Sequence, residues 1–177
     1  MISQQLIISG VGGQGILFIT RLLAETAIAK GMPVLTSETH GMAQRGGIVI
    51  SHLKAGAFSS PLVRPGHADG LIVLKPGNVR IHRSFLRPDG WIAANAGGPL
   101  SPGENEEAAT IDADTIAMQL GNPQAVNLIV LGRALATGRL FCAPDELDRA
   151  IRQRLQNKPA LLEEALAALA VGTGAGR

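Results

Sequence analysis

The sequence predicts a Rossmann-like α/β fold: one domain with an open, mostly parallel sheet flanked by helices and a helical C-terminal third. Three observations predict it. A short apolar run ends in a glycine-rich loop, a segment with helical periodicity follows directly, and a second apolar run comes next. Strands that alternate with helices form βαβ units, whose crossover is right-handed in nearly all proteins. The length of 177 residues is that of a single domain.

The first βαβ unit is predicted within about 33 residues of the N-terminus. Residues 5–10 are the first strand, 15–30 a helix with apolar residues at helical spacing, and 33–37 the second strand. Gly31 stands where a C-terminal cap belongs, and Pro33 prevents the helix from continuing.

The middle of the chain predicts more strands and one short helix. The strands are expected at 48–53, 70–74 and 91–94. A helix is expected over 78–86, ended by the turn signal Pro88-Asp89-Gly90. Residues 97–107 are rich in Gly, Pro and Glu, which favours an exposed loop rather than a domain boundary.

Three helices are predicted after this loop, over 125–137, from Pro144 onward, and over 160–171. We therefore expect residues 1–172 to form a single domain. Thr173–Arg177 is expected to be a frayed, glycine-rich tail.

Composition excludes several function classes. Hydrophobic residues make up 46% of the chain and charged residues 17%, so a substantial core is expected. The net charge is only +2, Tyr is absent, and Phe and Trp are few, so the basic stripe and stacking aromatics of a nucleic-acid surface are missing. No apolar run is long enough to span a bilayer, and the start lacks the pattern of a secretion signal. We expect a cytoplasmic protein.

A single cysteine restricts the redox chemistry of the chain. Cys142 alone cannot form an intrachain disulfide, a CxxC zinc site or an iron–sulfur cluster, and no metal site is expected. We interpret it as a small buried residue that leads into a helix, rather than as a nucleophile. His52, His67 and His82 are likewise interpreted as structural.

The first candidate binding segment is the glycine loop, which reads Gly10-Val11-Gly12-Gly13-Gln14-Gly15 and satisfies G-x-G-x-x-G between a strand and a helix. In this context Gly10 permits a tight turn, Gly12 lets the backbone approach a ligand, and Gly15 lets helix and strand pack closely. The N–H groups at the helix start could hold a phosphate or a carboxylate.

Three interpretations of this loop stay open. With Glu38 at the end of the second strand, the pattern is that of a free-standing nucleotide-binding module. Alternatively, the glycines only permit a sharp turn with close packing. In a third interpretation, the same amides bind the backbone or an acidic side chain of a partner.

The second candidate segment follows the second strand and reads Ser37-Glu38-Thr39-His40-Gly41-Met42-Ala43-Gln44-Arg45-Gly46-Gly47. Loops at the carboxyl ends of parallel strands line the ligand crevice, so this segment is expected beside the glycine loop. The planar guanidinium of Arg45 could donate two hydrogen bonds to a carboxylate or phosphate. The His40 imidazole could donate or accept a hydrogen bond, or titrate near neutral pH. A purely structural loop is the alternative. The candidate ligand- or partner-binding residues here are Glu38, His40, Gln44, Arg45, Gly46 and Gly47.

Together the two segments resemble the gamma-type domain of the 2-oxoacid:ferredoxin oxidoreductases. The pyruvate and oxoglutarate types usually carry Tyr-Gly-Pro-Glu before the Arg-Gly-Gly, whereas this chain has the residues 40–44, His-Gly-Met-Ala-Gln. This difference favours the small (beta) subunit of the indolepyruvate branch. Further similar stretches are Ser60-Pro61, Gly66-His67-Ala68-Asp69, Asn127 and Leu131-Gly132.

The resemblance implies a subunit of an enzyme that converts a 2-oxoacid to acyl-CoA by oxidative decarboxylation, with coenzyme A as co-substrate and ferredoxin as electron acceptor. It implies that thiamine diphosphate and the iron–sulfur clusters lie on a large partner subunit, and that this chain binds no cofactor and is inactive alone. Neither a catalytic residue nor a metal is expected here. The glycine loop and residues 40–47 would face the large subunit and a phosphate-bearing ligand, and the isolated chain could form a homodimer.

Overall fold

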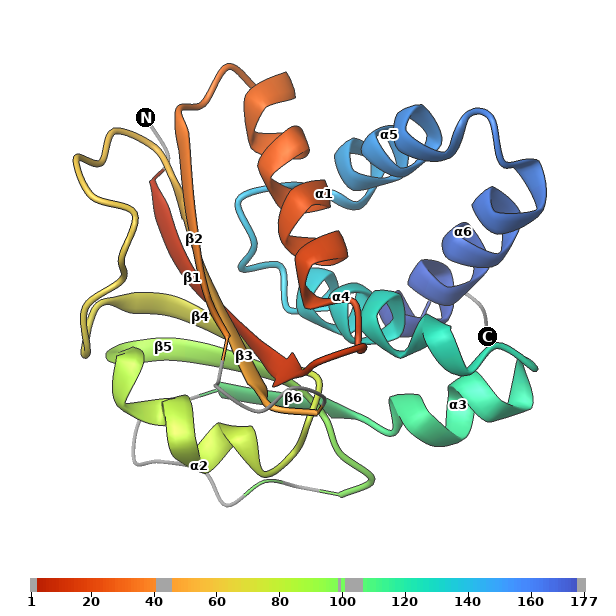
Figure 1. Ribbon diagram of the computed structural model, residues 1–177, viewed down its shortest axis with the longest axis horizontal. Helices are drawn as coiled ribbons and strands as arrows, with labels where there is room; N and C mark the ends of the chain where they lie inside the picture. The colour runs from red at the N-terminus through yellow and green to blue at the C-terminus, as the bar shows by residue number, and fades with distance from the viewer. Residues whose placement is uncertain (1–2, 41–45, 99, 101–106, 175–177) are drawn as a thin grey trace.

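The computed structural model describes residues 3–40, 46–98, 100 and 107–174. Six strands form one sheet in the order β2-β3-β1-β4-β5-β6. Their bounds are β1 Gln4–Val11, β2 Val34–His40, β3 Ile48–Ala55, β4 Ala68–Val73, β5 Leu86–Asn95 and β6 Glu107–Ile111. The predicted α/β class is therefore confirmed (Figure 1).

Five of the six strands run in the same direction. The strands β1, β4, β5 and β6 are joined by parallel pairings. β3 is antiparallel to both of its neighbours, β1 and β2, so β2 has the same direction as β1. The two strands of the first βαβ unit, β1 and β2, are therefore not neighbours in the sheet, because β3 lies between them. The sheet is mostly parallel, as predicted.

The helices are distributed unequally over the two faces of the sheet. Their bounds are α1 Ile16–Ala29, α2 Asn78–His82, α3 Ala113–Gln119, α4 Val126–Ala136, α5 Pro144–Leu155 and α6 Pro159–Thr173, with 3₁₀ turns at Arg83–Phe85 and Pro123–Ala125. Helices α1, α4, α5 and α6 cover one face, and α2 lies on the other (Figure 1).

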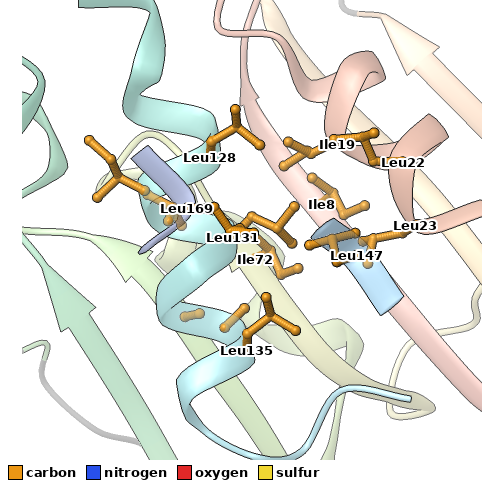
Figure 2. Close-up of a cluster of buried hydrophobic side chains, with 14 of the residues drawn as sticks. Ile8, Ile19, Leu22, Leu23, Ile72, Leu128, Leu131, Leu135, Leu147 and Leu169 are labelled. Carbon is orange, nitrogen blue, oxygen red and sulfur yellow. The ribbon is translucent and has the colours of Figure 1, made fainter. Parts of the chain in front are cut away.

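The alternation of side chains along the strands builds two cores. On the face covered by α4, Ile8 and Ile72 pack with Leu131 and with residues of α1 and α5 (Figure 2). On the opposite face, a smaller cluster contains Ile7 and Leu71, the sequence neighbours of those two strand residues. Because successive strand side chains point to opposite faces, strands buried on both sides are almost continuously apolar.

Helix α1 is ended as the sequence predicts. Gly31 has a φ of +70°, and its N–H donates to the carbonyl oxygen of Ile28. The N–H of Met32 reaches back to the carbonyl of Ala27, 3.0 Å away. A left-handed glycine after the last turn satisfies carbonyl groups that have no partner inside the helix.

The turn expected at Pro88–Gly90 is wrong, because these residues lie inside β5. The pairing of β4 with β5 shifts from Ala68–Leu86 to Gly70–Trp91, which places three extra residues in β5. The turn-forming residues therefore make a bulge and do not reverse the chain. The helix expected over 78–86 is also shorter, since only Asn78–His82 is α-helical.

Two elements were not predicted from the sequence, and the last helix extends into the expected C-terminal tail. The strand β6 and the helix α3 have no counterpart in the predicted elements. Thr173 is the last residue of α6 and Gly174, with φ +80°, caps it. Residues 175–177 of the predicted tail lie outside the described residues.

Candidate functional site at the carboxyl edge of the sheet

The structure brings the two predicted segments together at one edge of the sheet. β1 ends at Val11 and β2 ends at His40, and the two strands have the same direction. The N–H of Gly12 donates to the carbonyl oxygen of Gly47 at 3.0 Å, so the glycine loop and the end of the second segment are in direct contact. Their predicted proximity is confirmed. Gln44 and Arg45 lie outside the described residues.

The glycine loop is held in shape by its own glutamine. The side-chain oxygen of Gln14 accepts from the N–H of Val11 at 2.9 Å, and its Nε2 donates to the carbonyl of Leu74 at 3.3 Å. A Cβ at Gly10 would lie 2.6 Å from the same Gln14 oxygen. A side chain at position 10 would therefore displace the folded-back glutamine, which joins the loop to the end of β4.

Gly15 is needed for a different contact from the predicted one. It precedes α1 with a φ of +76°, in the left-handed region that favours glycine. A Cβ there would lie 2.2 Å from Nδ2 of Asn127, at the start of α4. The close approach at Gly15 is therefore to α4, and the expectation of close packing between α1 and its strand is corrected. Gly12 and Gly13 are exposed.

The carbonyl oxygen of Leu74 connects the glycine loop to the next strands. Besides Gln14, it accepts from Nδ2 of buried Asn95 at 3.2 Å. Asn95 Nδ2 also donates to the carboxylate of Asp114 at 2.9 Å, and its Oδ1 accepts from the N–H of Ala113 at 3.0 Å. These bonds fix the ends of β4 and β5 and the start of α3 relative to one another.

Sequence reasoning missed Asn95 and Asp114, although a signal was present. Asn95 is a polar residue at the end of a run of buried apolar residues, and it immediately precedes a glycine-rich stretch. Buried polar side chains are almost always hydrogen-bonded, so such a residue marks a built network.

A second buried network supports β1 from the opposite face. Asn78 Nδ2 donates to the carbonyl of Gly10 and to Oγ of Ser9, both at 3.0 Å. Ser9 Oγ lies 2.8 Å from Nδ1 of His82. His82 and His52 are both buried and hydrogen-bonded, which favours a structural role for these two histidines. Burial lowers the pKa of His82, and burial together with nearby Lys54 lowers the pKa of His52.

Glu38 does not occupy the place that a dinucleotide site requires. It pairs with Ser51 of β3, which in turn pairs with Ile8 of β1, so a complete strand separates Glu38 from the strand of the glycine loop. Two strand spacings amount to roughly 9.6 Å. In the dinucleotide-binding fold the second strand is next to the first. Glu38 instead lines a small polar cavity of about 440 Å³ with Thr20 and Arg21 of α1.

A larger cleft opens on the helical side of the glycine loop. It has a volume of about 510 Å³ and lies between Gly13–Gly15, the start of α4 and one face of α6. Its polar residues include Asn127 and Gln124, and its apolar wall includes Ala165 and Ala168. The cleft was not predicted, because the packing of α6 against α4 cannot be read from local patterns.

Among the described residues the side chains do not suit a metal ion, and the single cysteine of the sequence cannot hold an iron–sulfur cluster. Within the described ranges, no three His, Cys, Asp or Glu side chains are grouped closely enough to bind a metal ion. Cys142 is buried, as predicted, and burial with help from nearby Glu146 raises the pKa of its thiol to about 12. None of the described helices has the length and apolar character of a membrane span.

A family model described as pyruvate ferredoxin/flavodoxin oxidoreductase matches residues 5–175 of the chain. Among curated proteins, indolepyruvate oxidoreductase subunit IorB of Archaeoglobus fulgidus is 29% identical over 173 residues, covering 86% of both chains. IorB of Methanothermobacter thermautotrophicus is 28% identical over 190 residues, covering 95% of both.

Solved structures share the fold. The gamma subunit of a keto/oxoacid ferredoxin oxidoreductase from Geobacter sulfurreducens has a TM-score of 0.77 at 24% identity, covering 97% of this chain and 96% of that one. A 2-oxoglutarate:ferredoxin oxidoreductase from Magnetococcus marinus, whose structure has coenzyme A bound, gives a TM-score of 0.82 at 18% identity. The match covers 98% of this chain but 31% of that one, so there the domain is part of a longer chain.

Proposed function

Because the chain belongs to the pyruvate ferredoxin/flavodoxin oxidoreductase family, we propose that it is the small subunit of a heteromeric 2-oxoacid:ferredoxin oxidoreductase. The substrate class is an aryl-pyruvate such as indolepyruvate. The reaction converts the 2-oxoacid and coenzyme A to acyl-CoA and carbon dioxide, releasing one proton and an electron pair that ferredoxin accepts. The observation that carries the proposal is the similarity to IorB proteins over nearly the whole length of both chains.

Thiamine diphosphate and the iron–sulfur clusters belong, in this proposal, to a large partner subunit. A four-cysteine cluster cannot be held by a chain with one cysteine, and the thiol of Cys142 is buried and neutral. Those groups supply the carbon–carbon cleavage and the electron transfer. This chain contributes a shaped surface and binds no cofactor of its own, so alone it is inactive.

The contact surface toward the partner is the carboxyl edge of the sheet. Gly12 and Gly13 are exposed there, and their loop is hydrogen-bonded to the end of the 40–47 segment. His40, Gln44 and Arg45 supply the polar groups of that surface, which faces the large subunit and a phosphate-bearing ligand, coenzyme A being the co-substrate. We also propose a cytoplasmic location and, without the partner, a homodimer.

The test is co-expression with a large subunit that carries the thiamine-diphosphate and iron–sulfur sites, followed by a reductase assay. The purified complex should reduce ferredoxin or a viologen dye with indolepyruvate and coenzyme A, faster than with pyruvate. Arg45→Ala should lower that rate at least tenfold. The matched control is Arg149→Ala, at an exposed arginine on α5, which should leave the rate unchanged.

Two results would contradict the proposal. One is a chain that stays monomeric in light scattering and does not associate with the large subunit. The other is a complex whose rate is the same with and without this chain. An active complex that prefers pyruvate would instead correct only the substrate class.

A further inference from the structure

A groove opens on the helical side of the molecule, between α1, the end of α5 and the start of α6 (Figure 1). It has a volume of about 870 Å³. Two of the apolar side chains that line it, Ile28 and Leu161, have 61% and 44% of their surface exposed. Large apolar side chains gathered at the surface mark places where another molecule binds.

The wall of this groove that α1 and α5 share is already neutralised. Arg154 forms an ion pair with Glu25, and its guanidinium lies over the ring of Phe18, 5.8 Å from the centroid. These contacts hold the wall in place and leave no net charge on it. The charges that can select an occupant therefore lie on the opposite wall, along α6.

The wall formed by α6 has charges of opposite sign on the two sides of Leu161. Lys158, which directly precedes α6, and Glu164 are each three residues from Leu161, so the three side chains form one row along the helix. Both charged residues are exposed. Six residues of helix separate them by about 9 Å along the axis, so they do not pair with each other. Glu164 accepts a hydrogen bond from the neutral amide of Asn122 at 2.8 Å, and the described ion pairs do not include Lys158.

This row is complementary to a reversed copy of itself. In a contact with twofold symmetry, residue i of one copy meets residue j of the other, and j meets i. When two α6 helices pack antiparallel with Leu161 at the axis, each Lys158 lies opposite Glu164 of the second copy. One apolar contact and two ion pairs then form together, and the groove beside each Leu161 receives part of the opposing helix. A partner of another sequence would not require such a row, so the order of charges favours a second copy of this chain.

We propose that the start of α6 is a homodimer interface, in which Leu161 packs against Leu161 of a second copy and Lys158 pairs with Glu164 across the axis. The inference rests on the proposed function, which includes a homodimer, and it names the surface that forms it. This surface belongs to the helical side, whereas the proposed contact with the large subunit uses the carboxyl edge of the sheet. The test uses the isolated full chain, so the interface can fail while the proposed function stands.

The experiment measures the dimer Kd of the isolated chain by sedimentation velocity and light scattering over a range of concentrations. The wild type should be a dimer. Lys158→Glu and Glu164→Lys each place two pairs of like charges across the axis, so each should raise the Kd at least about tenfold. The double variant restores both ion pairs in reverse, and its Kd should return to within about threefold of the wild-type value.

The matched control is Glu163→Lys. Residue 163 is exposed and makes the same change of charge on the same helix, but it lies about 100° around the helix from residue 164 and does not line the groove. This variant should leave the Kd within about threefold of the wild-type value.

Three outcomes would overturn the inference. The first is a wild-type chain that is monomeric at the highest concentration reached, a result that needs no variant to fold. The second is that Glu163→Lys weakens the dimer as much as Glu164→Lys, because the position of the charge would then be irrelevant. The third is a double variant that dimerises no better than the single variants, because residues 158 and 164 would then not face each other.

Discussion

Gly132 of α4 and Gly172 of α6 meet backbone to backbone. A Cβ on Gly172 would lie 2.1 Å from the carbonyl oxygen of Ile129 and 2.9 Å from Cα of Gly132. A Cβ on Gly132 would lie 2.4 Å from the carbonyl oxygen of Leu169. The two helices can approach this closely only because neither position carries a side chain. This contact places α6 against α4 and so fixes one wall of the cleft beside the glycine loop.

We expect Gly172→Ala to destabilise the protein. Inside a helix, alanine is favoured over glycine by about 1 kcal/mol, but the clash with backbone atoms should outweigh this gain and give a net loss of about 1–3 kcal/mol. Urea unfolding measures the change. Gly77→Ala is the control, since a Cβ there meets nothing within 4 Å and the φ is −61°. Equal midpoints for Gly172→Ala and the wild type would refute the packing argument.

The two buried histidines should make the fold sensitive to acid. His52 Nδ1 accepts from the N–H of Val63 at 3.2 Å. Since Asn78 donates to Ser9 Oγ, the Ser9 hydroxyl can donate to Nδ1 of His82. Both rings are therefore expected to be neutral in the folded state. Burial is the main cause that lowers the pKa of each histidine, and Lys54 adds to the effect on His52.

The sign of this pH dependence follows from linkage. The unfolded chain binds protons at the ordinary histidine pKa of about 6.5, whereas the folded state does so only at lower pH. The free energy of unfolding should thus have its full value above pH 7. It should fall as the pH drops below about 6.5, by up to about 1.4 kcal/mol per pH unit for each histidine. Urea midpoints from pH 8 to pH 5 measure it. A His82→Asn variant should show a flatter profile; an unchanged slope would rule His82 out as a cause.

Cys142 should be unreactive in the folded protein. With a pKa raised to about 12, the thiol is neutral at pH 8, and only the thiolate reacts rapidly with alkylating reagents. Iodoacetamide labelling followed by mass spectrometry should show little modification in buffer and complete modification in concentrated urea. Complete labelling of the native chain within minutes would mean that the thiol is exposed.

The isolated chain should not bind NAD or FAD with micromolar affinity. β3 separates Glu38 from the strand that carries the glycine loop, so the carboxylate of Glu38 does not lie where a ribose would need it. Titration calorimetry with both dinucleotides tests this expectation. Micromolar binding that Glu38→Ala abolishes would restore the nucleotide-binding interpretation.

Local sequence signals predicted most elements because they depend on neighbours in the chain. The helix start after Gly15 and its end at Gly31 follow from backbone conformations that glycine adopts easily. The glycine loop does contact Gly47 as expected, but this contact continues the antiparallel pairing of β1 with β3, in which Val11 pairs with Ile48, and does not come from the parallel strands on which the expectation was based.

The remaining features depend on contacts between distant segments. Nothing in the sequences of β1 and β2 indicates that β3 lies between them and runs antiparallel to both. The short, alanine-rich strand β6 is defined by its pairing with β5. Pro88–Gly90 has the composition of a turn, and only the register against β4 shows that it is a bulge. The residues that contact Gly15 and Asn95 belong to other elements, so local sequence patterns could not predict these contacts either.

The position of β3 also affects how the protein is made. β1 pairs with β3 and β4, both of which are synthesised after β2, so residues 4–11 have no strand partner when they leave the ribosome. At least 55 residues must emerge before the first complete pairing of this strand can form. Pairings between distant segments are slow to form, and an unpaired apolar strand is prone to aggregation. Helix α1, which emerges next and packs against one face of β1, is the first element able to shield the nascent strand.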